Sequence, residues 1–209
     1  MAQPTIKLHY FPLRGRGETS RLVLHAANRE FVDDRIQFAD WSALKPKTPF
    51  GSLPYLEVGD EAFGQAQAIA SYLARENNLY GSSNLDALKI EQIQGLREDL
   101  FVEELKVWKE NDEAKKAEMT KNMNEVVYPK FLAYFERLIK DNQTKTNSKF
   151  TAGDKLSLAD IIVFEGTETL RQKNSALLDQ YPVVKEVNVL VASQESIKKY
   201  LDQRPVLSL

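Results

Sequence analysis

Few residues in this sequence are suited to chemistry, and the most informative is a tyrosine. The 209-residue chain has no cysteine and only two histidines, His9 and His25, which excludes a disulfide and a zinc-thiolate site, and we expect no metal. Any sulfur chemistry must therefore use the sulfur of a ligand. Tyr10 stands where an alternating apolar segment gives way to a loop, from which its hydroxyl can donate a hydrogen bond to an anion. A half-buried strand tyrosine bonded to backbone is the alternative interpretation.

The first part of the chain alternates strand and helix patterns around Tyr10. Pro12 and two glycines interrupt the first strand pattern before helical spacing begins, and Gly59-Asp60 suits a tight hairpin turn. This order predicts a four-stranded mixed sheet flanked by helices, including a short connecting helix, in the arrangement βαβ-α-ββα. The expected elements are a strand over 5–10, a helix over 18–27, a strand over 31–36, two short strands within 55–63 and a helix over 66–77.

The second part of the chain has only helical periodicity. Strand patterns stop after residues 81–84, so we expect an α/β domain over 1–80 followed by an all-helical domain over 83–209. Ser157 with Asp160 three residues later is typical of a capped helix start. Mixed charges over 106–121 indicate an exposed helix face or a loop. The other expected helices cover 86–108, 127–138, a segment that begins at Pro182, and one that ends before Arg204.

The composition excludes several classes of protein. Hydrophobic residues make up 43% of the chain and charged residues 28%, with a net charge of −2, so nothing attracts the whole molecule to nucleic acid or an anionic membrane. An acidic ligand therefore needs a local basic pocket. The N-terminus lacks the apolar core of a signal peptide and no stretch is apolar enough to span a bilayer, which makes the cytoplasm the expected compartment.

Five segments carry a pattern that covers nearly the whole chain: KLHYFPLRGRGE at 7–18, ADW at 39–41, KPKTPFGSLP at 45–54, QAQAIASYL at 65–73 and GDKLSLADI at 153–161. In this order they resemble the cytosolic glutathione transferases, most closely the sigma class and the related nematode enzymes. The resemblance implies a thioredoxin-like first domain that binds glutathione, an all-helical second domain that completes a pocket for hydrophobic electrophiles, and a homodimer.

The resemblance implies a catalytic role for Tyr10 and a supporting one for Arg16. A free thiol has a pKa of about 8.5 and is mostly protonated at neutral pH, whereas the thiolate is the reactive form. Tyr10 matches the family's tyrosine that donates to the sulfur anion. Arg16 matches an arginine that supports the anion by its charge, and the N-terminus of the following helix adds a partial positive charge.

The same resemblance implies which residues bind the tripeptide. Trp41 and Lys45 match the residues that bind its glycyl carboxylate. Leu53 precedes a proline that matches the family's cis proline and offers its backbone to the cysteinyl part. Asp99 matches a carboxylate that reaches the ligand's amino group across the dimer. The full set of glutathione contacts is Tyr10, Trp41, Lys45, Gly51, Ser52, Leu53, Pro54, Gln65, Ala66 and Asp99.

The chain departs from the family pattern at the γ-glutamyl site. Relatives usually have Gln-Ser there, whereas this chain has Gln65-Ala66. A lost hydrogen bond to a charged group is worth about 1.5 to 3 kcal/mol, so glutathione affinity is expected to fall roughly ten-fold to a hundred-fold. The prostaglandin synthases of the sigma class carry an aspartate cluster, where this chain has Gly95, Glu98 and Asp99, and a pocket tryptophan, where this chain has Lys106, so prostaglandin isomerisation is not expected.

We therefore expect a glutathione transferase that conjugates the thiol to hydrophobic electrophiles. The residues expected to line the electrophile pocket are Phe11, Leu13, Trp108 and Leu209. Two alternatives remain open: a carrier of haem or hydrophobic anions, and a structural protein like the mollusc lens crystallins, which resemble the same family.

Overall fold

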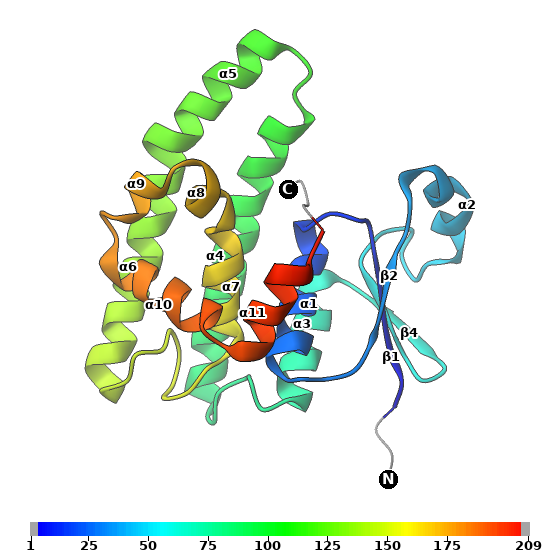
Figure 1. Cartoon of the computed structure of the whole chain (residues 1–209), viewed down its shortest axis with the longest axis horizontal. Helices are drawn as coiled ribbons and strands as arrows, with labels where there is room; N and C mark the ends of the chain where they lie inside the picture. Colours follow the sequence, from blue (N-terminus) through cyan, green and yellow to red (C-terminus); the bar gives the residue numbers. More distant parts are fainter. Residues whose placement is uncertain (1–3, 206–209) are drawn as a thin grey trace. The chain divides into compact units, whose positions relative to one another are not determined.

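The computed structural model describes residues 4–205 and forms two compact units, each shown in Figure 1. One unit holds the chain up to Leu79 together with the segment from Ser193, and the other holds Tyr80–Ala192. The second unit therefore begins near the boundary expected from the sequence. The last helix is grouped with the first unit, whereas the expected boundaries assign it to the helical domain.

A four-stranded mixed sheet with the strand order β2-β1-β3-β4 organises the first unit. The central strand β1 pairs in parallel with β2 and antiparallel with β3, and β3 forms a hairpin with β4 through Gly59 and Asp60. Leu8 of β1, which is fully buried, lies opposite Asp33 and Leu56. The predicted strands and hairpin are confirmed. Their bounds are β1 Ile6–Tyr10, β2 Val32–Arg35, β3 Tyr55–Val58 and β4 Glu61–Gly64.

Helices α1 and α3 pack against each other on one side of this sheet (Figure 1). Leu22 and Leu24 of α1 and Ile69 and Leu73 of α3 are buried, so the amphipathic faces predicted from their spacing form the core. Helix α11 also packs on α1. The helices of this unit are α1 Glu18–Ala26, the short α2 Trp41–Leu44 between two 3₁₀ turns, Phe38–Asp40 and Lys45–Lys47, then α3 Ala66–Glu76 and α11 Glu195–Gln203.

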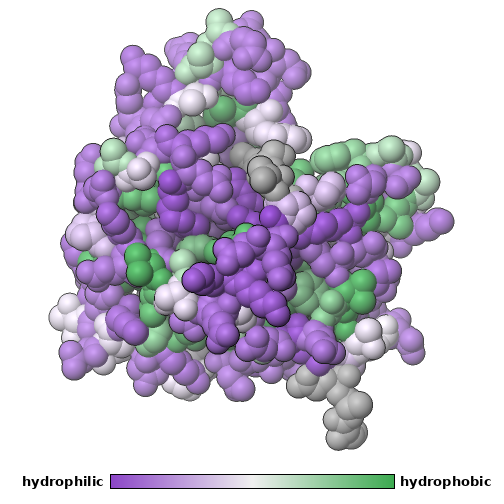
Figure 2. All heavy atoms as spheres, viewed as in Figure 1, coloured by the Kyte–Doolittle hydropathy of each residue, from purple (hydrophilic) through white to green (hydrophobic). Residues whose placement is uncertain are grey.

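Every element between Tyr80 and Ala192 is a helix, as predicted. The long helix α4 packs against α7, which in turn packs against α10. The charge-rich segment before α6 is the helix α5, whose side chains are exposed or half-buried, and polar side chains cover much of this unit's surface in Figure 2. The helices are α4 Asn84–Lys109, α5 Glu113–Asn122, α6 Tyr128–Thr146, α7 Leu158–Gly166, α8 Glu168–Lys173, α9 Ser175–Leu178 and α10 Pro182–Ala192, with a π-helical turn at Met123–Val127.

Helix α7 begins with the predicted cap. The Asp160 carboxylate is fully buried and accepts hydrogen bonds from the Ser157 N–H at 2.8 Å, the Ser157 hydroxyl at 3.0 Å and the Thr151 N–H at 2.7 Å. These bonds satisfy donors at the helix start and fix the loop before it, which lets the wholly apolar run Ile161–Phe164 enter the core.

We expect Asp160→Ala to destabilise the protein by about 2 to 4 kcal/mol, because three buried donors lose their acceptor. Thermal unfolding followed by circular dichroism measures the shift. Asp141→Ala, which removes an exposed carboxylate of α6, is the matched control and should leave the melting temperature within about one degree, as is usual for surface changes. Equal melting temperatures for the two variants would show that the cap contributes nothing.

Candidate active site

Tyr10 ends β1 and turns its ring into the protein, where only 7% of the residue is exposed. Its hydroxyl oxygen accepts a hydrogen bond from the Arg16 backbone N–H at 3.0 Å. A phenol can accept and donate at the same time, so this bond fixes the oxygen while its O–H remains a donor group. The arrangement suits the holding of an anion beside the ring.

Two glycines allow the loop to close around Tyr10. Gly15 has φ +38°, which favours glycine, and a Cβ built there would lie 2.5 Å from the Tyr10 hydroxyl oxygen. A Cβ on Gly17 would lie 2.5 Å from Cδ1 of the Tyr10 ring. Both positions therefore require the absence of a side chain, which is how the Arg16 N–H comes within reach of the hydroxyl.

Arg16 itself lies in the 3₁₀ turn Gly15–Gly17, directly before α1, and its side chain is half-buried. The first residue of α1 is Glu18, whose carboxylate is completely buried. The structure thus places an acidic group at the helix start, where the sequence analysis expected only the partial positive charge of the helix.

An aromatic cluster extends from Tyr10 to the expected glycyl-binding residues. The Phe11 ring stacks on Phe38 with centroids 4.6 Å apart and meets Trp41 edge-on at 5.6 Å, while Tyr10 lies 5.8 Å from Phe11. Phe11, which was expected to line the electrophile pocket, therefore also positions the indole of Trp41. The ammonium-bearing side chain of Lys45 is exposed one turn later.

The segment that leads into β3 contains the cis proline that the sequence analysis expected. The Leu53–Pro54 peptide bond is cis, as the family pattern predicted. Gly51 has φ +62°, and the Lys45 side chain passes near it, since a built Cβ would lie 3.7 Å from Lys45 Cε. Ser52 is exposed, so the polar surface of this turn faces solvent next to Lys45.

Gln65 has an unusual backbone conformation at the start of α3. Its φ of 74° lies in the region that side-chain-bearing residues rarely adopt, and such strained positions concentrate at binding sites. No side chain caps the helix at Gln65. Gln65 is exposed and Ala66 is the first residue of the helix, so the helix N-terminus offers its backbone N–H groups to a carboxylate.

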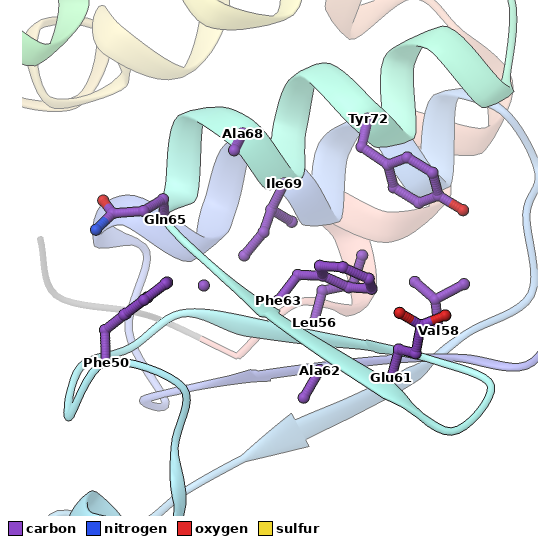
Figure 3. Close-up of a pocket in the computed structure, with 11 residues that line it drawn as sticks. Phe50, Leu56, Val58, Glu61, Ala62, Phe63, Gln65, Ala68, Ile69 and Tyr72 are labelled. Carbon is purple, nitrogen blue, oxygen red and sulfur yellow. The ribbon is translucent and has the colours of Figure 1, made fainter.

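A cavity of about 620 Å³ lies next to Gln65, between the β3–β4 hairpin and α3. Figure 3 shows Gln65 and Phe50 at one end of it and Val58, Glu61 and Tyr72 toward the other. Its wall is mainly apolar, and two of its rings, Phe50 and Phe63, are 67% and 47% exposed. The sequence analysis did not predict this surface.

The remaining predicted residues lie elsewhere in the chain. Asp99 is exposed on α4, and Trp108, near the end of the same helix, is 47% exposed, so both belong to the helical unit. Leu13 is buried in the loop after β1. Leu209 lies outside the described residues.

One important residue escaped the sequence analysis. Arg21 is completely buried in α1 and donates hydrogen bonds to the backbone carbonyls of Phe11 and Leu13 in the loop that follows Tyr10. The signal was present: Glu18 and Arg21 are three residues apart, the spacing of an intrahelical ion pair, and the apolar run Leu22–Leu24 follows them.

Neither metal ligands nor membrane spans are evident in the described part of the chain. Within residues 4–205 no group of three or more His, Asp or Glu side chains could hold a metal ion. The helices described there are all too short or too polar to cross a membrane.

Comparison with known proteins agrees with this geometry over both units. The chain matches the family model for the glutathione S-transferase N-terminal domain over residues 6–75 and that for the C-terminal domain over residues 98–204.

Individual relatives match over nearly their full length. Probable glutathione S-transferase 7 of Caenorhabditis elegans is 34% identical over 96% of this chain and 97% of that protein. S-crystallin SL11 of Nototodarus sloanii is 33% identical over the same shares of the two chains. Prostaglandin synthase D of Nilaparvata lugens has a similar structure, with a TM-score of 0.86 and 32% identity over 97% of this chain and 100% of that one. The chain therefore belongs to the glutathione S-transferase family, and it is a glutathione S-transferase with a thioredoxin-like first domain.

Proposed function

We propose that this protein conjugates glutathione to hydrophobic electrophiles and that Tyr10 keeps the bound thiol ionised. The observation that carries the proposal is the Tyr10 hydroxyl held at the end of β1 by the Arg16 N–H at 3.0 Å. A hydrogen bond donated to the sulfur favours its charged form and lowers the thiol pKa. The chain has no cysteine, so the nucleophilic sulfur is that of the glutathione.

The neighbouring residues suit the other parts of the tripeptide. Trp41, held by Phe11, and the exposed ammonium of Lys45 would bind the glycyl carboxylate. The backbone of Leu53 would pair with the cysteinyl part, in the turn formed by Gly51, Ser52 and Pro54. These contacts hold the sulfur in place, and such orientation accounts for much of the rate gain in reactions of bound substrates.

The γ-glutamyl end would lie at Gln65 and Ala66. The strained backbone of Gln65 and the first turn of α3 favour a carboxylate there, even though alanine replaces the usual serine. Asp99 would supply a countercharge to the ligand's amino group from a second copy of the chain. The affinity for glutathione is therefore expected to be lower than in relatives with a serine at position 66.

A structural or carrier role is the second candidate function, because one relative is an S-crystallin at 33% identity. Tyr10, Trp41, Lys45 and Gln65 are all present in this chain, which favours catalysis. A titration of turnover against occupancy by a hydrophobic anion such as haem separates a catalyst from a carrier, since a carrier binds with little turnover.

The similarity to a prostaglandin synthase concerns the fold more than the expected site. Gly95 is exposed, and Lys106 forms an exposed ion pair with Glu103 at 2.6 Å, where the synthases of the sigma class carry an aspartate and a pocket tryptophan. These differences favour detoxification-type conjugation over prostaglandin isomerisation. A cytoplasmic location and membership of the sigma or nematode class are further parts of the proposal.

A homodimer is part of this proposal. The cavity beside α3 has a mainly apolar wall with Phe50 and Phe63 exposed, and neighbouring exposed aromatic rings are a feature of protein interfaces. A second copy of the chain covering this face would bury these rings.

We expect Tyr10→Phe to reduce kcat/KM for glutathione about 10²- to 10³-fold, because the only change is the loss of one hydroxyl that stabilises the anion. A steady-state assay with a generic aromatic halide measures the effect, and calorimetry checks that glutathione still binds. Folding should be unchanged. Turnover equal to that of the parent would refute the role of Tyr10.

Gly17→Ala should destabilise the protein by about 1 to 3 kcal/mol and reduce turnover, because the new methyl group overlaps the buried Tyr10 ring. Gly95→Ala is the matched control, since a Cβ there meets no atom within 4 Å among the described residues and alanine favours a helix. Melting temperature and turnover are measured for both. Similar values for the two variants would show that the loop does not need this glycine.

Phe63→Ser should weaken dimerisation by about 2 kcal/mol or more, a typical loss for an aromatic side chain at the centre of an interface. Sedimentation velocity over a dilution series measures the dissociation. Val189→Ser removes an apolar side chain of α10 that is even more exposed than Phe63, and it should leave the dimer intact. A parent protein that sediments as a monomer at high micromolar concentration would contradict the proposal.

A further inference from the structure

Two buried charges on α1 lie beside the Tyr10 loop and have no assigned role. Arg21 and Glu18 are both fully buried, and Arg21 Nη1 lies 3.3 Å from Glu18 Oε2. Burial of an ion pair costs more than the pair returns unless the remaining donors and acceptors are also satisfied. The other hydrogen-bond partners of Arg21 and Glu18 therefore indicate the role of the pair.

The guanidinium of Arg21 donates hydrogen bonds to the loop after Tyr10 and to strand β2. Nη1 donates to the Leu13 carbonyl at 2.8 Å, Nη2 donates to the Phe11 carbonyl at 3.2 Å, and Nε donates to Asp33 at 2.9 Å. The guanidinium carbon is also 5.7 Å from the centre of the Tyr10 ring. A single planar group thus fixes two carbonyls of the loop between Tyr10 and Gly15, which carries the catalytic hydroxyl.

The carboxylate of Glu18 bonds residues near the C-terminal end of the described chain. Its carboxylate accepts from the Tyr200 hydroxyl at 3.0 Å and from the Arg204 guanidinium at 2.5 Å. Burial and the charge of Glu18 raise the pKa of Tyr200, so this hydroxyl remains a donor. The Tyr200 ring stacks on His25 of α1 at 4.0 Å. Helix α11 is therefore joined to the helix that holds the Tyr10 loop.

The charges around Arg21 keep its guanidinium ionised. Burial alone would lower the pKa of Arg21, but Asp33 and Glu18 raise it overall. Arg35 of β2 bonds the second Asp33 oxygen at 2.7 Å, and burial lowers the pKa of His25, which leaves that ring neutral near pH 7. Arg21 and His25 therefore keep these charge states near neutral pH.

We propose that Arg21 and Glu18 are positioning residues for the conjugation reaction, which hold the Tyr10 loop against α1 and connect it to α11. The inference rests on the proposed function, in which Tyr10 stabilises the thiolate. Lysine at position 21 keeps the charge but has its N–H donors on one nitrogen, so it cannot reproduce the bonds that three separate nitrogens of Arg21 make to the two carbonyls and Asp33. The hydroxyl of Tyr10 would then be held less closely to the sulfur.

The test compares Arg21→Lys with the parent by two measurements. Ultraviolet absorbance of the thiolate, titrated against pH with glutathione saturating, gives the pKa of the bound thiol, and steady-state kinetics give kcat and KM separately. Arg21→Lys should raise this pKa by about one unit and lower kcat near pH 6.5 about tenfold, with KM for glutathione changed less than about threefold.

Arg97→Lys is the matched control. Arg97 is an arginine of α4, little exposed and ion-paired with Glu165 at 2.7 Å and Glu104 at 3.0 Å, so lysine there disrupts a comparable buried network outside the Tyr10 loop. It should lower the melting temperature without moving the pKa of the bound thiol. A shift of the same size in both variants would show that general destabilisation, and not loop positioning, causes it.

Parallel measurement of Tyr10→Phe separates the two hypotheses. A raised thiol pKa in Tyr10→Phe together with a parent-like pKa in Arg21→Lys overturns the positioning role alone. A parent-like pKa in Tyr10→Phe overturns the proposed function and the present inference with it.

Tyr200→Phe gives a milder test that does not depend on the folding of Arg21→Lys. It removes only the hydroxyl that bonds Glu18 and keeps the ring stacked on His25. We expect it to lower kcat about two- to threefold and to raise the pKa of the bound thiol by less than Arg21→Lys does. An unchanged pKa and kcat would contradict the connection through α11.

Discussion

The role proposed for the Tyr10 hydroxyl requires that the backbone around it is fixed, and hydrogen bonds to one loop provide that fixation. The Arg16 N–H bonds the Tyr10 oxygen, while the buried guanidinium of Arg21 bonds the carbonyls on the other side of the same loop. Because Arg21 and Tyr10 are buried, these bonds are stronger than they would be at the surface, and each lost partner would be costly. The sheet and α1 serve to bring these donors and acceptors to the end of β1.

The need to hold the backbone close to the Tyr10 ring also explains why the loop is rich in glycine. Gly15 and Gly17 have no side chain, and a methyl group at either position would collide with Tyr10. Glycine is costly in the unfolded chain because it has more conformations to lose, so its presence twice in three residues indicates that closeness to the ring outweighs that cost. The strained backbone of Gln65 shows a similar balance at the start of α3.

Family membership alone does not distinguish a catalyst from a structural protein, because relatives of similar identity include a probable transferase and an S-crystallin. The distinction depends on individual side chains at the site. In this chain the side chains proposed to bind the sulfur and the glycyl carboxylate are present, and Trp41 contacts Phe11, whereas Ala66 has no hydroxyl to offer the γ-glutamyl end. The site is therefore expected to favour reaction at the sulfur with weaker retention of the tripeptide.

Sequence by itself determined the two-part order of elements, the hairpin at Gly59-Asp60 and the Ser157–Asp160 cap, because each follows from local periodicity or from residues a few positions apart. Motifs also indicated Tyr10 as the catalytic candidate and the Leu53–Pro54 bond as cis. Tertiary structure decided what depends on contacts between distant segments: the bonds from Arg21 to the Tyr10 loop, the link from Glu18 to Tyr200, and the apolar cavity beside α3. The longest of these contacts joins residues 182 positions apart. The spacing of Glu18 and Arg21 indicates an ion pair, but a local pattern does not tell which loop or helix the other donors and acceptors of the pair bond.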